Sequence, residues 1–126
     1  IENAALTYSM EDYLEMICRL AQTGGAVRVR DLAAKLNVKP PSASKMAGKL
    51  RDLGLVSFEK YAAVALTERG RQEGEYLLYR HGVLHAFLCL VNGTDNELEQ
   101  VEKIEHYLDR RTIKNIAALV ERLGGR

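Results

Sequence analysis

Hydrophobic residues recur at helical spacing along most of the chain. The first stripe predicts a helix that begins with Ser9 as its N-cap and ends before Gly24. Its inward-facing residues are Met10, Tyr13, Leu14, Ile17 and Leu20. A second helix is predicted over residues 29–36. A third begins at Pro40, because proline is tolerated in the first turn of a helix, and extends to about Leu53.

Between residues 55 and 67 the pattern changes from helical to extended. β-branched and aromatic residues there predict two short strands, joined at a tip formed by Ala62 and Ala63. Neither residue suits a two-residue primed turn, which favours glycine or asparagine, so we expect a longer loop. Thr67 is the predicted N-cap of a long helix that follows and runs towards Leu90.

Two more helices are predicted at the end of the chain, over residues 95–109 and 112–123. In the loop before them, Thr94 and Glu97 have the spacing of a capping box. The first of the two helices carries one buried stripe, made of Val101, Ile104 and Leu108. Apolar residues beyond Leu90 exceed what two short helices can hide, so we expect a homodimer interface here. Its expected members are Val91, Ile113, Ile116, Leu119, Val120 and Leu123.

The order of these elements indicates the fold. Helix, helix, turn, helix and two-stranded hairpin is the layout of a winged helix-turn-helix. We therefore predict a mainly α protein, with a winged helix-turn-helix DNA-binding domain over residues 1–72. An all-helical domain for metal binding and dimerisation is expected over residues 73–126.

Composition excludes several classes of protein. With 126 residues, of which 47% are hydrophobic and 28% charged, the chain has the makeup of an ordinary globular protein. No apolar run approaches the roughly 20 residues that a membrane-spanning helix needs. Cys18 and Cys89 lie within apolar helical patterns and form no spaced disulfide framework. We expect a reduced, cytoplasmic protein with no membrane partner.

The net charge of +1 conceals a strong asymmetry. Residues 26–51 contain seven basic residues and one acidic residue, whereas residues 92–109 contain one basic and six acidic residues. The first segment suits phosphate groups and the second suits cations.

The basic segment coincides with the turn and the third helix, where a helix-turn-helix contacts DNA. The Pro40 start is expected to present backbone N–H groups and a positive helix end to the DNA, while serine hydroxyls bond phosphates or base edges. Ala43 is expected to meet a thymine methyl group, and lysines to neutralise phosphates. For any single lysine the alternative is an ordinary solvated helix face. The predicted DNA-binding residues are Arg28, Lys39, Pro40, Ser42, Ala43, Ser44, Lys45, Lys49 and Lys60.

Five stretches of the chain resemble a known family. In order and spacing, SMEDYLE, KPPSASKMAGKL, FEKYAAVALTERG, YRHGVLHAFL and VEKIEHYLD are similar to the diphtheria-toxin-repressor family, and above all to its manganese-responsive branch. The resemblance implies a homodimeric, manganese-responsive transcriptional repressor that binds double-stranded operator DNA and controls metal homeostasis. It implies no enzymatic activity and no small organic substrate.

The resemblance also implies a two-metal cluster that holds about two Mn(II) ions per subunit. Its ligands fall on Asp12, Glu15, His81, Glu102, Glu105 and His106. Iron-responsive members of the family carry a methionine and a cysteine at the positions of Asp12 and Glu102. Structural alternatives exist: Asp12 in a capping box, Glu15 paired with Arg19, and His81 as a surface or core histidine. Four converging carboxylates, however, would repel one another unless cations neutralised them.

Other functions fit the sequence less well. His81 and His85 have the spacing of the zinc-protease motif, but Gly82 stands where that motif has its general base, which excludes this chemistry. His85 is then expected to be structural or solvent-facing. Two alternatives to the manganese-responsive repressor stay open. One is a regulator of the same fold that responds to iron or another metal, and the other is a metal-independent winged-helix regulator.

Overall fold

The computed structural model describes residues 6–59 and 63–125. The chain divides after Leu77 into two compact units. Unit 1 extends to Leu77 and unit 2 begins at Leu78. The boundary predicted from the sequence, after residue 72, lies within the same helix, α4 (Glu68–Asn92).

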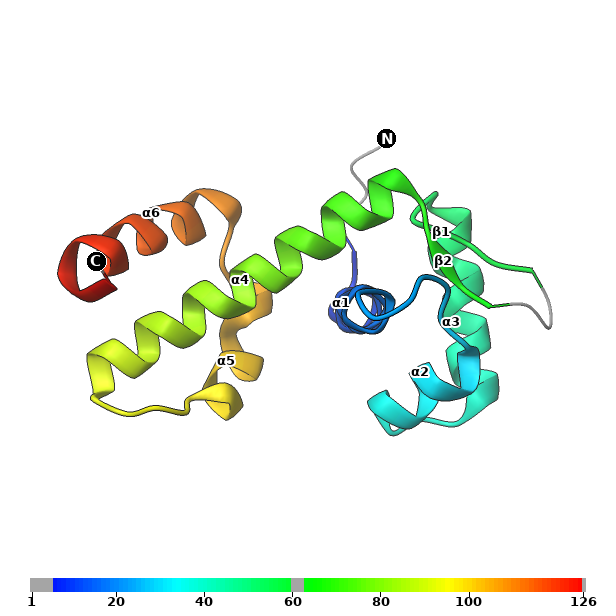
Figure 1. Cartoon of the computed structure of the whole chain (residues 1–126), viewed down its shortest axis with the longest axis horizontal. Helices are drawn as coiled ribbons and strands as arrows, with labels where there is room; N and C mark the ends of the chain where they lie inside the picture. Colours follow the sequence, from blue (N-terminus) through cyan, green and yellow to red (C-terminus); the bar gives the residue numbers. More distant parts are fainter. Residues whose placement is uncertain (1–5, 60–62, 126) are drawn as a thin grey trace. The chain divides into compact units, whose positions relative to one another are not determined.

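Unit 1 has the order of elements expected for a winged helix-turn-helix. Its helices are α1 (Tyr8–Ala21), α2 (Val29–Leu36), α3 (Pro40–Asp52) and the first part of α4. The two strands, β1 (Val56–Ser57) and β2 (Ala65–Leu66), lie between α3 and α4 (Figure 1). The predicted helices over residues 29–36 and from Pro40 are confirmed.

The N-cap of α1 is Thr7, so the prediction of Ser9 was wrong. The hydroxyl Oγ1 of Thr7 accepts a hydrogen bond from the backbone N–H of Met10 at 3.1 Å. Thr7 is extended, with φ −71° and ψ 163°, as an N-cap residue requires. Ser9 is therefore already helical, and a capping box between Ser9 and Asp12 does not form.

A single hydrophobic core holds unit 1 together. The helical stripes predicted from the sequence point into it, and its largest fully buried side chains are Leu14, Ile17, Leu32, Leu50, Leu55 and Val64. Burying one such side chain contributes about 1.5–3 kcal/mol to stability. Ala43 and Ala47 are also fully buried, so α3 presents small side chains to this core. The three helices and the hairpin consequently form one packed unit.

The hairpin confirms the expectation of a long connection. Val56 pairs with Leu66 and Ser57 with Ala65, so residues 58–64 separate the two strands in the sequence. Val64 also forms an antiparallel bridge with Val27, in which both N–H···O distances are 2.7 Å. Of the residues predicted at the wing, Lys60 and Ala62 lie outside the described part of the chain.

The hairpin leads into α4 through a close backbone contact. Thr67 is the predicted cap: its Oγ1 accepts from the Gly70 N–H at 3.0 Å and donates to the Gly54 carbonyl at 2.7 Å. A Cβ atom on Gly70 would lie 1.8 Å from the carbonyl oxygen of Leu55. Only glycine therefore fits at position 70, and the first turn of α4 packs directly on the backbone before β1.

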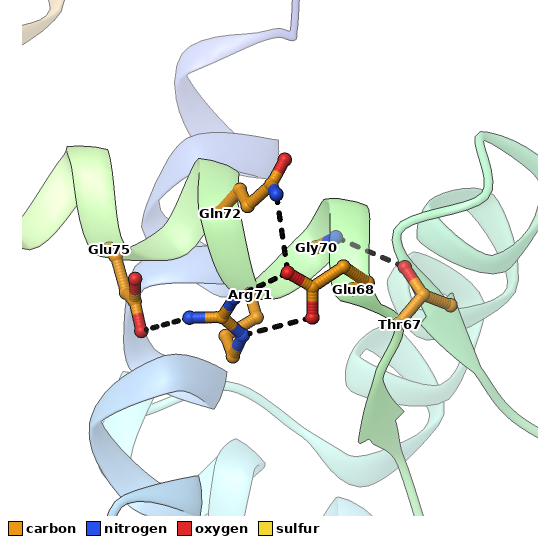
Figure 2. A network of polar contacts seen from close by, with 6 residues as sticks. All are labelled: Thr67, Glu68, Gly70, Arg71, Gln72 and Glu75. Carbon is orange, nitrogen blue, oxygen red and sulfur yellow. Dashed lines mark hydrogen bonds and ion pairs between the residues drawn. The ribbon is translucent and has the colours of Figure 1, made fainter.

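Charged side chains line the first turns of α4, as Figure 2 shows. Arg71 pairs with Glu68 and donates to Glu75 at 2.8 Å, while Gln72 donates to Glu68 at 3.2 Å. The hydrogen bonds from Arg71 lower the pKa of the Glu68 carboxyl. These groups are exposed, so the network contributes little to stability.

Unit 2 consists of the rest of α4, α5 (Leu98–Ile104), a 3₁₀ turn η1 (Glu105–Tyr107) and α6 (Arg110–Val120). A single π-helical turn, η2 (Glu121–Gly125), follows α6. The core of unit 2 contains Leu84, Leu88, Val101 and Ile113, with Ile104 and Leu108 packed against it. The stripe predicted from Val101, Ile104 and Leu108 therefore faces a core.

The continuous helix predicted over residues 95–109 was wrong, because it ends at Ile104. Asp109 is the N-cap of α6, and its carboxylate accepts from the Thr112 backbone N–H at 2.8 Å. This hydrogen bond lowers the pKa of Asp109. Asp109 is extended, with φ −84° and ψ 171°, so the chain leaves the helical conformation before residue 109, through η1 and an extended Leu108.

The predicted capping box of Thr94 and Glu97 was also wrong. Glu97 is itself the N-cap of α5, and Thr94 Oγ1 donates to the Glu97 carboxylate at 2.7 Å.

Among the described residues, no helix combines the length and the apolar composition needed to cross a lipid bilayer.

Candidate functional site

Unit 1 carries a groove that combines basic and apolar side chains. Its volume is about 940 Å³, and it lies along the start of α2, one face of α3 and the base of the hairpin. Its lining residues are Arg28, Val29, Arg30, Pro40, Ser44, Lys45, Gly48, Arg51, Phe58 and Ala63. Arg28, Pro40, Ser44 and Lys45 were predicted from the sequence to bind DNA.

The first turn of α3 differs from the expectation in one respect. Pro40 and Pro41 have no backbone N–H, and the N–H groups of Ser42 and Ala43 both donate to the carbonyl of Lys39, at 2.9 and 3.2 Å. The N–H groups of Ser42 and Ala43 are therefore already occupied. The start of α3 instead presents its positive helix dipole and its exposed polar side chains to an anion.

The predicted contact residues on α3 fall on two faces. Ser42, Lys45 and Lys49 are exposed, as are Arg28 and Lys39 before their helices. Ala43 has no exposed surface and belongs to the core of unit 1. The prediction that Ala43 meets a thymine methyl was therefore wrong. The spacing of its core neighbours, Ala47 and Leu50, is that of one helical stripe, and this periodicity would have placed Ala43 inside.

Arg30 and Arg51 line the groove but were not among the predicted contacts. Arg51 lies seven residues after Ser44 and three after Gly48, on the same face of α3. Its guanidinium donates to the Phe58 carbonyl at 3.2 Å and so ties α3 to the wing. Helical periodicity counted from Ser44 was the signal that could have identified Arg51.

Of the predicted metal ligands, unit 1 contains Asp12 and Glu15, which lie three residues apart on α1. Glu15 accepts a hydrogen bond from Arg19 at 2.8 Å, so the ion pair considered as its structural alternative is confirmed. A carboxylate has two oxygens and several lone pairs, so this ion pair does not exhaust the ligand capacity of Glu15. Capping does not explain Asp12, since the N-cap of α1 is Thr7.

Unit 2 contains the other four predicted ligands and brings two of them together. His81 Nδ1, on α4, lies 3.0 Å from Glu105 Oε1 in η1. Glu105 is only 3% exposed, and a buried carboxylate requires a partner of this kind. His106 is half-buried, with Nδ1 3.5 Å from the Arg80 guanidinium, and Glu102 is exposed on α5.

The sequence matches one family over nearly its whole length. Residues 5–64 match the iron dependent repressor in its N-terminal DNA binding domain, and residues 67–124 match its metal binding and dimerisation domain. The chain belongs to the iron dependent repressor family.

Named relatives agree with this assignment. The chain is 42% identical over 116 residues to the HTH-type transcriptional regulator MntR of Geobacillus kaustophilus (strain HTA426). The aligned region covers 91% of this chain and 82% of the relative. It is also 42% identical over 117 residues to MntR of Bacillus subtilis (strain 168), with the same coverage.

Solved structures show the same fold. A manganese-dependent transcriptional repressor in complex with manganese has a TM-score of 0.73 and 31% identity, over 88% of this chain and 52% of that chain. The manganese regulator SloR has a TM-score of 0.76 and 26% identity, over 89% of this chain and 53% of that chain. The chain thus spans about half the length of these solved proteins.

Membership of the iron dependent repressor family establishes the general function. The protein is a metal-responsive DNA-binding repressor that binds operator DNA as a homodimer, and it is not an enzyme. The groove on unit 1 falls within the matched DNA-binding domain, and the His81–Glu105 pair falls within the matched metal-binding domain.

The matched dimerisation domain also carries an apolar groove, of about 560 Å³, between α4 and α6. Its lining residues are Leu78, Tyr79, Gly82, Val83, Ala86, Ala117, Val120 and Glu121. Near the ends of these helices, Val91 and Leu123 are 60% and 66% exposed. Ile113, which was expected at the subunit interface, is instead fully buried within unit 2.

Proposed function

We propose that this repressor responds to manganese, controls metal homeostasis in the cytoplasm, and holds about two Mn(II) ions per subunit. The observation that carries the proposal is the contact between His81 and the buried Glu105 carboxylate. An imidazole nitrogen and a carboxylate oxygen are held 3.0 Å apart within the matched metal-binding domain. Both groups suit a divalent cation.

The chemistry of the proposed donor set supports manganese. The proposed ligands are Asp12, Glu15, His81, Glu102, Glu105 and His106. Carboxylate oxygens suit manganese, whereas thiolate and thioether ligands select softer metals. The set contains four carboxylates and neither of the two cysteines. Two divalent ions would balance the four negative charges, with both imidazoles neutral.

The distribution of these ligands along the chain supports a route from metal binding to DNA binding. Asp12 and Glu15 belong to the DNA-binding domain, and the other four belong to the metal-binding domain. The carboxylates of the proposed ligands in both domains are negatively charged, and divalent ions would neutralise that charge. We propose that the shared ligands restrict the motion of each DNA-binding domain in the dimer. Two recognition helices with a fixed spacing then match the half-sites of an operator.

The direct test is whether DNA binding depends on metal. In fluorescence anisotropy at fixed salt, we expect operator affinity to rise between about 5- and 150-fold on adding manganese, the usual range of allosteric coupling. A chelator should reverse this rise. Equal affinity with manganese and with chelator would favour a metal-independent regulator and contradict the proposal.

We propose that α3 is the recognition helix and that Lys45 and Lys49 contact phosphates, since both are exposed basic residues on it. Lys45→Ala and Lys49→Ala should each weaken binding to all DNA sequences. Each should also flatten the log–log dependence of affinity on salt by about 0.9 unit, as expected for one lost phosphate contact. Ser42→Ala should instead change which operator is preferred, because a side chain that reads bases affects specificity.

The control for the lysines is Lys114→Ala, which removes an exposed lysine from α6, outside the groove on unit 1. Its salt dependence should equal that of the parent protein. An unchanged slope in both Lys45→Ala and Lys49→Ala would show that α3 does not meet the DNA backbone in the manner proposed.

We propose that the partner subunit packs on the apolar groove between α4 and α6. Gly82 and Ala86 are small, so a helix of a second copy could approach α4 closely there. Ala117→Glu places a charge in the groove and should shift the protein towards monomer at micromolar concentration in light scattering. Asn115→Glu, on an exposed position of the same helix, should remain dimeric. A dimeric Ala117→Glu variant would place the interface elsewhere.

A further inference from the structure

Two histidines on adjacent turns of α4 contact the two ends of one acidic segment, residues 97–105. His81 lies next to Glu105 at the end of the segment, with a distance of 3.0 Å between Nδ1 and Oε1. His85, four residues later, accepts a hydrogen bond at Nε2 from the Glu97 backbone N–H at 3.1 Å. His85 was expected to be structural or solvent-facing, and this contact with Glu97, the N-cap of α5, favours the structural alternative.

The contact identifies the tautomer of a neutral His85. An imidazole nitrogen that accepts a hydrogen bond carries no proton, so the proton of a neutral His85 lies on Nδ1. The thiol of Cys89 lies 3.5 Å from the same Nε2 atom. The side chain of Glu97 is held separately, by hydrogen bonds from Thr94 at 2.7 Å and Asn92 at 3.2 Å. His85 therefore binds the backbone of Glu97, while Thr94 and Asn92 bind the Glu97 side chain.

This backbone contact matters because α5 is weak by itself. It spans seven residues, and isolated helices of that length are not stable in water. Its N-cap has no side-chain capping hydrogen bond. Asn96 Oδ1 accepts from the first amide of α5, Leu98, at 3.0 Å. The position of α5 further depends on the packing of Val101 and Ile104 on the core of unit 2 and on the two histidine contacts at its ends.

We propose that His85 is a positioning residue for the metal centre. It holds the beginning of α5 on α4, so that Glu102, Glu105 and His106 are ordered together before any metal binds. The inference rests on the proposed function, because it concerns ligands proposed there, but His85 itself is not a ligand. Without the acceptor at position 85, this segment becomes ordered only when metal binds. The free-energy cost of that ordering then lowers the affinity for the metal.

The test compares three variants. His85→Leu removes the acceptor, His85→Gln keeps an acceptor oxygen at a similar reach, and Cys89→Ala removes the neighbouring thiol. In the metal-free protein, hydrogen exchange of the Glu97 amide followed by NMR should be faster in His85→Leu and near the parent rate in His85→Gln and Cys89→Ala. The ¹⁵N shifts of His85 in the parent protein should show the neutral Nδ1–H tautomer.

Calorimetry with manganese provides the second measurement. We expect His85→Leu to bind about tenfold more weakly with an unchanged number of ions, as for other residues that orient metal ligands. His85→Gln should restore most of the affinity, and Cys89→Ala should match the parent protein. Circular dichroism verifies that each variant is folded.

Four results would overturn the proposal. A lower number of bound ions in both His85→Leu and Cys89→Ala would make His85 a ligand of a further ion. An unchanged Glu97 exchange rate in His85→Leu would show that the contact does not order α5. If the parent protein binds manganese and His85→Leu binds it with the same affinity, the positioning role alone is refuted. No uptake by the parent would instead refute the proposed function, and the role of His85 with it.

Discussion

Replacing Glu102 and His106 by alanine together is expected to abolish manganese uptake and manganese-dependent DNA binding. Glu102 lies on α5, within the acidic segment of unit 2, and His106 lies in η1, directly after that segment. Removing them takes away one oxygen ligand and one nitrogen ligand from the proposed set. The remaining residues cannot supply the coordination that two Mn(II) ions need, because manganese is held weakly relative to later divalent metals even by complete sites.

The measurement is calorimetric titration of the dimer with manganese, followed by anisotropy with operator DNA. The matched control is Glu99→Ala, which removes a carboxylate from an exposed position of α5 outside the proposed set. This control should keep both the number of ions and the response of DNA binding. Uptake that persists in the double variant would mean that the metal is held by other residues.

Exchanging two hard ligands for soft ones is expected to change the metal that activates the repressor. Asp12→Met combined with Glu102→Cys removes two carboxylates and places a thioether and a thiol at the positions where iron-responsive members of the resembled family carry them. Soft ligands favour iron, cobalt or zinc over manganese. We expect the double variant to lose manganese activation and to keep or gain activation by ferrous iron or cobalt.

The experiment is an anaerobic DNA-binding titration of both proteins with each metal at fixed salt, since salt alone changes the affinity. Asp12→Asn with Glu102→Gln is the control, because it removes the same two charges without adding sulfur. It should lose manganese activation and gain nothing with iron. A parent that responds better to ferrous iron than to manganese at matched free-metal levels, or a sulfur variant that keeps its manganese response, would contradict the assignment of manganese.

The candidate site shows where sequence reasoning succeeds and where it stops. Lys45 and Lys49 were predicted to be exposed on a basic helix, and both are exposed. Ala43, between the exposed Ser42 and the half-buried Ser44, is buried, because a helix turns about 100° per residue and adjacent positions face different surroundings. The ligand set came from a resemblance to a family. Of that set, unit 2 shows one direct pair, His81 and Glu105.

By itself, the sequence determined the elements whose signals are local. The helix over residues 29–36, the helix start at Pro40, the Thr67 cap and the long wing connection depend on residues within a few positions of one another. Periodicity and proline geometry act over that range, so these elements could be predicted. Side-chain capping was predicted correctly at Thr67 but wrongly at Ser9 and Thr94, where neighbouring residues offer competing caps.

Only the tertiary structure decided the features that join distant parts of each unit. His85 accepts from an amide twelve residues away, His81 meets a carboxylate twenty-four residues away, and Arg51 binds the carbonyl of Phe58 across the start of the wing. The break in the helix predicted over residues 95–109 belongs with them, because packing on the core and the cap of α6 outweighed a continuous helical pattern. Contacts of this kind depend on how the elements pack, and the spacing of residues within one element carries no information about that packing.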